Sequence, residues 1–252
     1  MKRFFRFLLF FLFISLNAAP KELIFHAEYC PPFICSQNSD SPGFAVEVLK
    51  AVYPEKDFRI SIRFWGWQSA ARELKRNKIS AYIGMSKADY PEFPVPRYPI
   101  YHLQSAVYAK SALKLKYTGP ESLAKIKTGF QVDYSHSDEF DAYQKRHAKD
   151  GSLLYYRKNR AAENMIKGIA SGKIRAFVHY TAAVQWALLN KPEFRKKLKR
   201  IALLDNRTDF YVVFARKKDS KELIGIFNRR FPEFIKTEKY REFLRKYGLD
   251  EK

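Results

Sequence analysis

The chain of 252 residues lacks the short motifs by which several large enzyme classes are recognised. It contains no Gly-X-Ser-X-Gly sequence, no His-Glu-X-X-His sequence and no glycine-rich phosphate loop. Its five histidines do not have the spacing of metal ligands. These absences exclude the hydrolases, metalloproteases and nucleotide-dependent enzymes that carry such motifs. We therefore expect no catalytic residues, no bound metal and no cofactor.

Long apolar runs are also scarce, and the one such run lies at the N-terminus. Phe4–Leu16 is rich in Phe and Leu, begins among three basic residues, and is followed by the small residues Ala18 and Ala19. This run is shorter than the roughly 20 residues that a membrane-spanning helix needs. Such a segment is typical of a secretory signal peptide. We expect residues 1–18 to be a signal peptide cleaved after Ala18, with a transmembrane anchor as the alternative.

Cysteine occurs twice, at Cys30 and Cys35. Two nearby cysteines offer too few ligands for a metal site. In the oxidising environment that an exported protein enters, a close pair is a disulfide candidate. The loop between the two residues is short, so the stabilisation from closing it would be modest. We expect a disulfide between Cys30 and Cys35, with two free thiols as the alternative.

Acidic residues are few: 26 Asp and Glu stand against 47 Lys and Arg, which gives a net charge of +21. Removal of the basic signal segment would leave about +18. Such a charge raises the question of nucleic-acid binding. The basic residues, however, are spread over amphipathic segments, without zinc-finger spacing, an aromatic RNA-binding motif or a long basic tail. We therefore expect no nucleic-acid partner, and a solvated basic surface that can also lie against anionic membranes.

The most informative feature that is present is an internal repeat. Residues Glu73–Gly84 align without gaps on residues Gly168–His179. Each copy reads as the end of an amphipathic helix, a tight turn at Asn77 or Gly172, and a short apolar strand. Asn and Gly tolerate the left-handed backbone that ends a helix, and wholly apolar strands are typical of parallel sheets covered on both faces. The repeat indicates two related lobes.

Segments with strand and helix patterns alternate along the chain, which indicates an α/β architecture. The expected strands are Glu22–Ala27, Arg59–Phe64, Ile79–Ile83, Ser105–Ala109, Lys127–Gln131, Ile174–Val178 and Phe210–Arg216. The expected helices are Phe44–Val52, Gln68–Arg76, Ser137–Ala148, Ala161–Ser171, Thr181–Leu189, Leu223–Phe231 and Glu238–Tyr247. We expect residues 19–110 and 208–252 to form lobe 1 and residues 111–207 to form lobe 2, because the last strand would return the chain to the first lobe.

The repeat also predicts where a ligand would bind. In open α/β sheets a ligand lies beyond the carboxyl ends of the parallel strands. The repeat places Gly84, Met85 and Ser86 at the end of one strand, and His179 and Tyr180 at the end of its equivalent. These residues would form the two facing walls of a cleft between the lobes.

Several segments, taken in order, resemble the family 3 extracellular solute-binding proteins, the binding components of polar amino-acid ABC transporters. Residues 29–33 (Tyr-Cys-Pro-Pro-Phe) resemble the aromatic-X-Pro-Phe loop of that family, and residues 43–49 resemble its Gly-Phe-Asp-Val helix start. Trp67 followed by residues 84–86 (Gly-Met-Ser) resembles its Trp…Gly-Met-Thr stretch, and residues 130–135 resemble its second-lobe loop with a hydroxyl at a helix start. The resemblance covers nearly the whole chain after the signal segment.

This resemblance implies the periplasmic binding protein type II fold, with two mostly parallel sheets flanked by helices and a ligand cleft between two lobes. It implies a monomeric periplasmic protein that captures a small solute and presents it to the membrane component of an ABC transporter. Together with the repeat, it implies the following ligand-binding residues: Tyr29, Phe33, Trp67, Gly84, Met85, Ser86, Ser135, His179 and Tyr180.

Two of these residues also have a structural interpretation. Ser135 could cap the helix that contains residues 138–143, because a hydroxyl at a helix start accepts a hydrogen bond from the free N–H groups there. The same free N–H groups could instead bind an anion. His179 could be a hydrogen-bonded structural histidine at the end of its strand.

Two charged residues of the family pattern are absent. Amino-acid binders of this family usually carry an Arg five residues beyond the Gly-Met-Thr motif, where it grips the ligand carboxylate, and Pro91 occupies that place here. The Asp that binds the ligand ammonium group corresponds to Tyr180. We therefore expect a small polar or aromatic solute, neutral or weakly anionic, in place of an α-amino acid. Arg97, in the following loop, is either a replacement ligand-binding residue or a surface charge.

The alternative function is enzymatic, because a fold does not determine a function. A small periplasmic lyase of the dehydratase type could use the same scaffold, with Tyr180 or His179 as acid or base. The absence of a recognisable catalytic set favours the binding protein over the enzyme.

Overall fold

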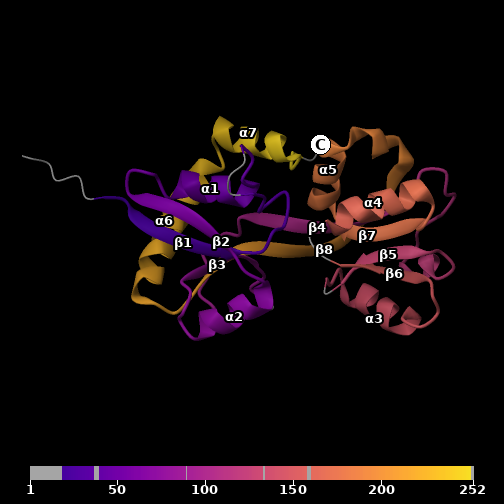
Figure 1. Cartoon of the computed structure of the whole chain (residues 1–252), viewed down its shortest axis with the longest axis horizontal. Helices are drawn as coiled ribbons and strands as arrows, with labels where there is room; N and C mark the ends of the chain where they lie inside the picture. Colours follow the sequence, from indigo (N-terminus) through magenta and orange to yellow (C-terminus); the bar gives the residue numbers. More distant parts are fainter. Residues whose placement is uncertain (1–18, 37–39, 89, 133, 158–159, 251–252) are drawn as a thin grey trace, which may run out of the picture.

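A computed structural model of the chain describes residues 19–36, 40–88, 90–132, 134–157 and 160–250. The expected signal peptide, residues 1–18, lies outside these ranges. Figure 1 shows two groups of helices and strands, joined by the long strands β4 (Tyr101–Lys110) and β8 (Leu198–Phe214). We call these groups the first lobe and the second lobe. No helix in the described ranges is long and apolar enough to cross a membrane.

The first lobe contains three strands that precede β4 and four helices. They are β1 (Lys21–Ala27), α1 (Phe44–Val52), β2 (Phe58–Phe64), α2 (Trp67–Lys75), β3 (Ala81–Met85), α6 (Lys218–Phe234) and α7 (Glu238–Tyr247). β1 pairs in parallel with β2 and β3, and β3 pairs antiparallel with the end of β8. The helices α1, α6 and α7 cover one face of these strands, and α2 covers the other.

The second lobe repeats this three-layer arrangement. Its elements are η1 (Pro120–Leu123), β5 (Thr128–Gln131), α3 (Asp138–His147), β6 (Leu153–Tyr156), α4 (Ala161–Ser171), β7 (Ala176–Tyr180), α5 (Thr181–Asn190) and η2 (Pro192–Lys197). β5 pairs in parallel with β6 and β7, and β7 pairs antiparallel with β4. The helices α4 and α5 pack on one face, and α3 packs on the other. β6 was not predicted from the sequence, because it is a four-residue strand at the edge of the sheet with no buried residue.

The strands that join the lobes are longer than the sequence pattern predicts. The sequence pattern predicts only Phe210–Arg216 as a strand, whereas β8 begins at Leu198 and ends at Phe214. Its first part pairs with β4 and forms an edge of the sheet in the second lobe, where charged side chains face solvent. Because β8 pairs with both β3 and β4, the two expected sheets are joined in one hydrogen-bonded order, β2-β1-β3-β8-β4-β7-β5-β6.

The internal repeat corresponds to equivalent helix–turn–strand units, α2–β3 and α4–β7. Asn77 and Gly172 both have positive φ angles, 55° and 77°, as the turn chemistry predicts. Each strand begins two residues later than the apolar run, at Ala81 and Ala176. The repeat therefore predicted a real structural equivalence between the lobes.

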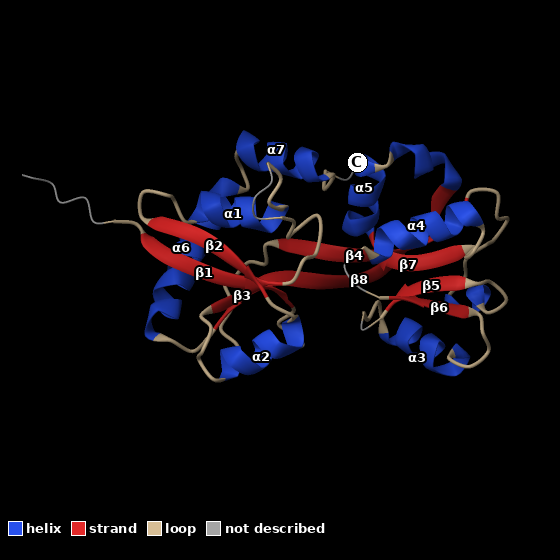
Figure 2. Cartoon of the chain, in the orientation of Figure 1, coloured by secondary structure: helices blue, strands red, loops and turns tan. Residues whose placement is uncertain are grey.

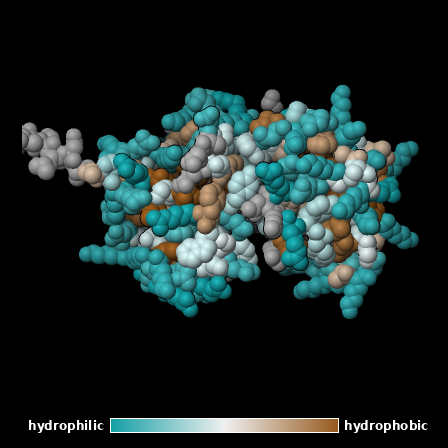
Figure 3. Space-filling model, viewed as in Figure 1, coloured by the Kyte–Doolittle hydropathy of each residue, from teal (hydrophilic) through white to brown (hydrophobic). Residues whose placement is uncertain are grey.

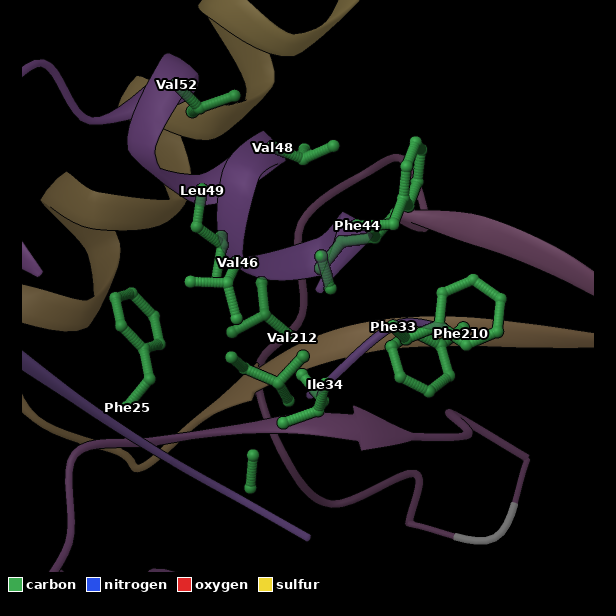
Figure 4. Close-up of a cluster of buried hydrophobic side chains, with 14 of the residues drawn as sticks. Phe25, Phe33, Ile34, Phe44, Val46, Val48, Leu49, Val52, Phe210 and Val212 are labelled. Carbon is green, nitrogen blue, oxygen red and sulfur yellow. The ribbon is translucent and has the colours of Figure 1, made fainter. Parts of the chain in front are cut away.

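The loop after β1 is fixed against the start of α1. The N–H groups of Phe44 and Ala45 donate to the carbonyl oxygens of Pro32 and Phe33, at 2.9 and 3.0 Å. Gly43 has a φ of 119°, and a Cβ at this position would lie 2.3 Å from the Phe33 carbonyl oxygen, so only glycine permits this approach. Figure 4 shows the ring of Phe33 beside that of Phe210, with Phe44 nearby. This packing holds the preceding residues of the loop at the end of β1.

Candidate ligand-binding cleft

A cavity of about 1530 Å³ lies between the lobes, and Figure 3 shows a notch between the two halves of the molecule. Residues at or just beyond the ends of β1, β3, β5 and β7 line this cavity. It therefore lies where the carboxyl ends of parallel strands meet, as expected for α/β sheets. Every ligand-binding residue expected from the sequence lines the cavity, except Arg97.

The first-lobe wall is built by the loop after β1, the start of α2 and the end of β3. The ring of Trp67 packs edge-on against Tyr90, with ring centroids 6.1 Å apart. Gly84 has a φ of 99°, and a Cβ there would lie 2.9 Å from the Phe210 ring, so glycine lets the strand end approach this ring. The Ser86 hydroxyl accepts a hydrogen bond from the Ala88 N–H, at 3.1 Å, and fixes the turn after β3.

The second-lobe wall is a cluster of four rings. Tyr134 and His136 come from the segment between β5 and α3, and His179 and Tyr180 come from the end of β7. The Tyr180 ring centroid lies 5.7 Å from that of Tyr134 and 5.6 Å from that of His136. This wall offers flat apolar surfaces together with phenolic hydroxyls, which suits a planar or aromatic ligand group.

Both histidines in this wall are held as neutral rings. His179 Nε2 donates to Gln131 Oε1 at 2.8 Å, and His136 Nδ1 hydrogen-bonds the Ser105 hydroxyl at 2.9 Å. Burial lowers the pKa of His179 to about 4. Burial, followed by the nearby His179, lowers the pKa of His136 to about 3. At neutral pH neither ring supplies a positive charge to a ligand.

Side chains of the loop after β1 contact the second lobe across the cleft. The Arg160 guanidinium, at the start of α4, hydrogen-bonds the Tyr29 hydroxyl of the first lobe. The Tyr134 hydroxyl of the second lobe and the Cys30 thiol of the first lobe also share a hydrogen bond. The two walls therefore touch at residues 29 and 30, directly after β1.

The expected disulfide is absent, because Cys30 and Cys35 are both free thiols. Cys30 forms an antiparallel bridge with Ile34, so Cys30 and Ile34 direct their side chains to the same face of this small hairpin. The Cys35 thiol lies 3.9 Å from the Pro32 carbonyl oxygen. The Cys30 thiol is instead hydrogen-bonded to Tyr134. The two thiols thus have different partners, although their short spacing suggested a disulfide.

Two further expectations need correction. The residue that caps α3 is Ser137, whose hydroxyl accepts from the Phe140 N–H at 3.2 Å, whereas Ser135 donates to Asp141 Oδ2 at 2.7 Å. Arg97 does not line the cavity: its N–H donates to Asn228 Oδ1 at 2.7 Å, and its exposed guanidinium lies over the Tyr98 ring. Asn228, on α6, thus holds the loop with Arg97 against the first lobe.

Sequence reasoning missed several charged residues of the cavity. The basic ones are Lys87, Arg157, Arg160, Lys191 and Arg207, and the acidic ones are Glu28, Glu163 and Asp209. Glu163 pairs with Lys167 at 2.8 Å, and Asp209 pairs with His102 at 2.7 Å. Glu28 forms no ion pair with another described residue. Glu28 directly follows β1, so the rule that ligands lie beyond the carboxyl ends of parallel strands could have identified it as a cavity residue. No sequence motif marks Arg160.

Comparisons with known proteins agree on the fold. No family model and no curated protein matches the sequence. A solved structure of an ancestral arginine-binding protein bound to arginine is similar, with a TM-score of 0.66 and 17% identity, over 91% of this chain and 99% of that chain. A structure from work on glutathione import in Streptococcus mutans has a TM-score of 0.70 and 15% identity, over 90% and 95% of the two chains.

A third similar structure comes from a different functional setting. It is a histidine kinase sensor domain with similarity to periplasmic binding proteins, with a TM-score of 0.66 and 16% identity, over 91% and 96% of the two chains. At such identities the similarity establishes the fold and not the ligand. The chain has the two-lobed α/β fold of the periplasmic binding proteins.

Proposed function

We propose that this protein captures a small polar or aromatic solute between its two lobes and is not an enzyme. The observation that carries the proposal is the cavity itself, which the strand ends of both lobes line together. The lobes are linked by the paired strands β4 and β8, which can bend to close the cleft around a solute. We assign residues 19–110 and 208–252 to the first lobe and residues 111–207 to the second.

The lining of the cavity supports a solute other than an α-amino acid. A zwitterion in a closed cleft needs partners of opposite charge for both of its charged groups, because an unpaired buried charge is strongly unfavourable. Pro91 and Tyr180 stand where related amino-acid binders carry these partners, and Arg97 lies outside the cavity. Of the charged residues in the lining, Glu163 and Asp209 are already in ion pairs and Arg160 is bonded to Tyr29. Stacking on Trp67 and Tyr134 is what the cleft offers in addition.

An enzymatic role receives no support from the two residues that could perform it. His179 is hydrogen-bonded to Gln131, and its pKa of about 4 makes it a weak base at neutral pH. Tyr180 packs within the ring cluster, against Tyr134 and the two neutral histidines His136 and His179. We therefore assign both residues to ligand contact and to the structure of the second-lobe wall.

The proposed setting follows from the N-terminal segment and the fold. We propose that residues 1–18 direct export to the periplasm, where the protein acts as a monomer. Proteins of this fold include binding components of ABC importers, and we propose an ABC transporter membrane component as the partner that receives the solute.

The direct test is native mass spectrometry of the protein purified from cells that express it with its signal segment. We expect an added mass of a small molecule, which denaturation releases for identification. A protein that carries no small molecule after purification, and binds none from a periplasmic extract, would contradict the proposal.

A matched pair of variants then locates the site. Trp67 and Trp65 are similarly exposed, at 37% and 40%, but only Trp67 lines the cavity. We expect Trp67→Ala to weaken binding of the identified solute roughly tenfold, because a stacked aromatic contributes about 0.5–1.5 kcal/mol beyond its buried area. Trp65→Ala should leave binding unchanged. Equal effects of the two variants would place the solute elsewhere.

A further inference from the structure

The end of the second lobe that faces away from the cleft gathers exposed basic residues. β4 ends there, while β5, β7 and β8 begin there, and Figure 2 shows the arrow of β5 pointing from this end toward the first lobe. Main-chain hydrogen bonds connect these strand ends. The N–H of Lys110 donates to the Arg175 carbonyl at 2.9 Å, and that of Arg175 donates to the Lys127 carbonyl at 2.8 Å. The N–H of Ser111 donates to the Lys197 carbonyl at 2.9 Å.

With two sequence neighbours, these residues form a cluster that we call the basic pole. It consists of Lys110, Lys127, Lys173, Arg175, Lys196 and Lys197, and all six are exposed. None of the six forms an ion pair with another described residue. Two acidic residues of this lobe already have partners: Glu121 pairs with Arg146 and His147, and Asp150 pairs with His147. Glu193, at the start of η2, offsets only one of the six positive charges, so the pole keeps a large excess of positive charge.

Protection of a sheet edge does not explain this cluster. Lysines on edge strands hinder pairing with other chains, and this role accounts for Lys199 and Arg200, where β8 forms the edge. Lys110, Lys127 and Arg175, however, lie at the ends of β4 or just before β5 and β7, which are inner strands. Their positive charges therefore call for another explanation.

The composition of the pole distinguishes between classes of anionic partner. Five of its six residues are lysines, which are flexible point charges and do not form the planar two-bond contacts of arginine. None of the exposed large apolar side chains lies in the pole: these are Phe64, Trp65, Trp67, Tyr155, Leu189, Leu203 and Ile235. Specific protein interfaces and single-stranded nucleic-acid sites rely on aromatic anchors, whereas a fluid array of lipid phosphates needs only mobile positive charge.

We propose that the basic pole binds the surface of anionic phospholipid membranes. Binding would be peripheral and reversible by salt, because it rests on exposed charges alone. The pole lies at the opposite end of the second-lobe strands from the cleft, so a protein held in this way keeps its cleft open to solutes. The proposal does not depend on which solute the cleft accepts.

The test is co-sedimentation of the protein, without its signal segment, with vesicles. Two vesicle types are compared: pure phosphatidylcholine, and phosphatidylcholine with about one-third phosphatidylglycerol. We expect binding to the anionic vesicles at roughly 0.1 M salt, its loss at about 1 M salt, where the screening length falls to about 3 Å, and no binding to neutral vesicles. Binding to neutral vesicles, or no binding to either type, would overturn the proposal.

A charge-matched pair of variants locates the surface. The pole variant carries Lys110→Gln, Lys127→Gln, Lys173→Gln and Lys197→Gln. The control variant removes the same charge from the first lobe through Lys50→Gln, Lys56→Gln, Lys218→Gln and Lys221→Gln, at exposed residues without ion pairs to described residues. We expect the pole variant to bind anionic vesicles at least roughly tenfold more weakly and the control to bind within about twofold of the parent.

Other outcomes count against the lipid surface. Equal losses in the two variants would mean that total charge, and not the pole, drives binding. Binding of a soluble polyanion such as heparin, lost in the pole variant, without binding to vesicles would assign the pole to a polyanionic macromolecule. Circular dichroism and thermal unfolding of both variants show that any loss is not a loss of fold.

Discussion

Asn77 and Gly172 end equivalent helices of the two lobes with the same left-handed backbone, at φ angles of 55° and 77°. An L residue with a Cβ atom is disfavoured there, and Asn tolerates this region better than most residues. A Cβ at Gly172 would meet no heavy atom within 4 Å, so the cost of a substitution would lie in the backbone alone.

Substitutions at these two turns should therefore have unequal effects on stability. We expect Gly172→Ala to lower the free energy of unfolding by about 1–2 kcal/mol. Asn77→Gly should change it by only a few tenths of a kcal/mol, because glycine adopts this conformation freely. Urea unfolding followed by circular dichroism measures both values. A Gly172→Ala protein as stable as the parent would show that the turn relaxes to a right-handed conformation.

Acid should destabilise the protein through His136 and His179. Burial lowers their pKa values to about 3 and about 4, from 6.5. As the pH falls below 6.5, the unfolded chain takes up protons at these histidines and the folded chain does not. The stability they contribute is complete above that pH and is lost progressively toward pH 4, by up to about 1.4 kcal/mol per pH unit for each histidine.

Denaturant unfolding at a series of pH values checks this dependence. His179→Asn removes one of the two titrating groups. The slope of the free energy of unfolding against pH should therefore fall by up to about 1.4 kcal/mol per pH unit, the contribution of one proton. Carboxylates titrate in the same window, so the informative quantity is the difference in slope between variant and parent. Identical slopes would mean that His179 titrates normally in the folded protein.

Both cysteines should titrate as free thiols. We expect two reactive thiols in unreduced protein that has been denatured, and one in the Cys30→Ala variant. In the folded protein at pH 8 alkylation should be slow, because burial raises the pKa of Cys30 to about 11 and that of Cys35 to about 12. Absence of thiols in the unreduced, denatured protein would restore the disulfide that the spacing suggested.

Standard amino acids should bind weakly. Calorimetry with the twenty standard amino acids should detect no submicromolar binding, because loss of a charge-assisted hydrogen bond costs about 1.5–3 kcal/mol and two such bonds are missing. The decisive variant is Glu28→Gln, since Glu28 is the acidic residue of the cavity without an ion pair to a described residue. Submicromolar binding that Glu28→Gln abolishes would mean that Glu28 replaces the missing Asp.

The sequence predicted local structure well where periodicity and turn chemistry agree. Phe44–Val52, Ala161–Ser171 and Glu238–Tyr247 are helices with the expected bounds. The left-handed turns at Asn77 and Gly172 were also predictable, because few residue types accept that conformation. By contrast, the first part of β8 has its apolar residues 201–204 between charged ones and lacks a clear strand pattern, and its pairing with β4 defines it as a strand.

The candidate site was predictable only in part. The expectation that ligands lie beyond the carboxyl ends of parallel strands located Gly84, Met85 and His179 at the cavity, because these strands end on a common edge. It could not locate Tyr134 or Arg160, whose positions depend on how loops of the second lobe meet the first. The orientation of Cys30 and Cys35 likewise depends on a hairpin register that spacing alone does not reveal.

The pairing of Lys110 with Leu198 in β4 and β8 has a consequence for the order of folding. If this contact formed first, it would close a loop of all the residues from 111 to 197, at a cost in chain entropy. Once the second lobe has folded, its own packing holds these two strands together. The remaining part of β8 then lies in position to pair with β3. The inserted lobe should therefore fold early and act as the template on which the chain termini complete the first lobe.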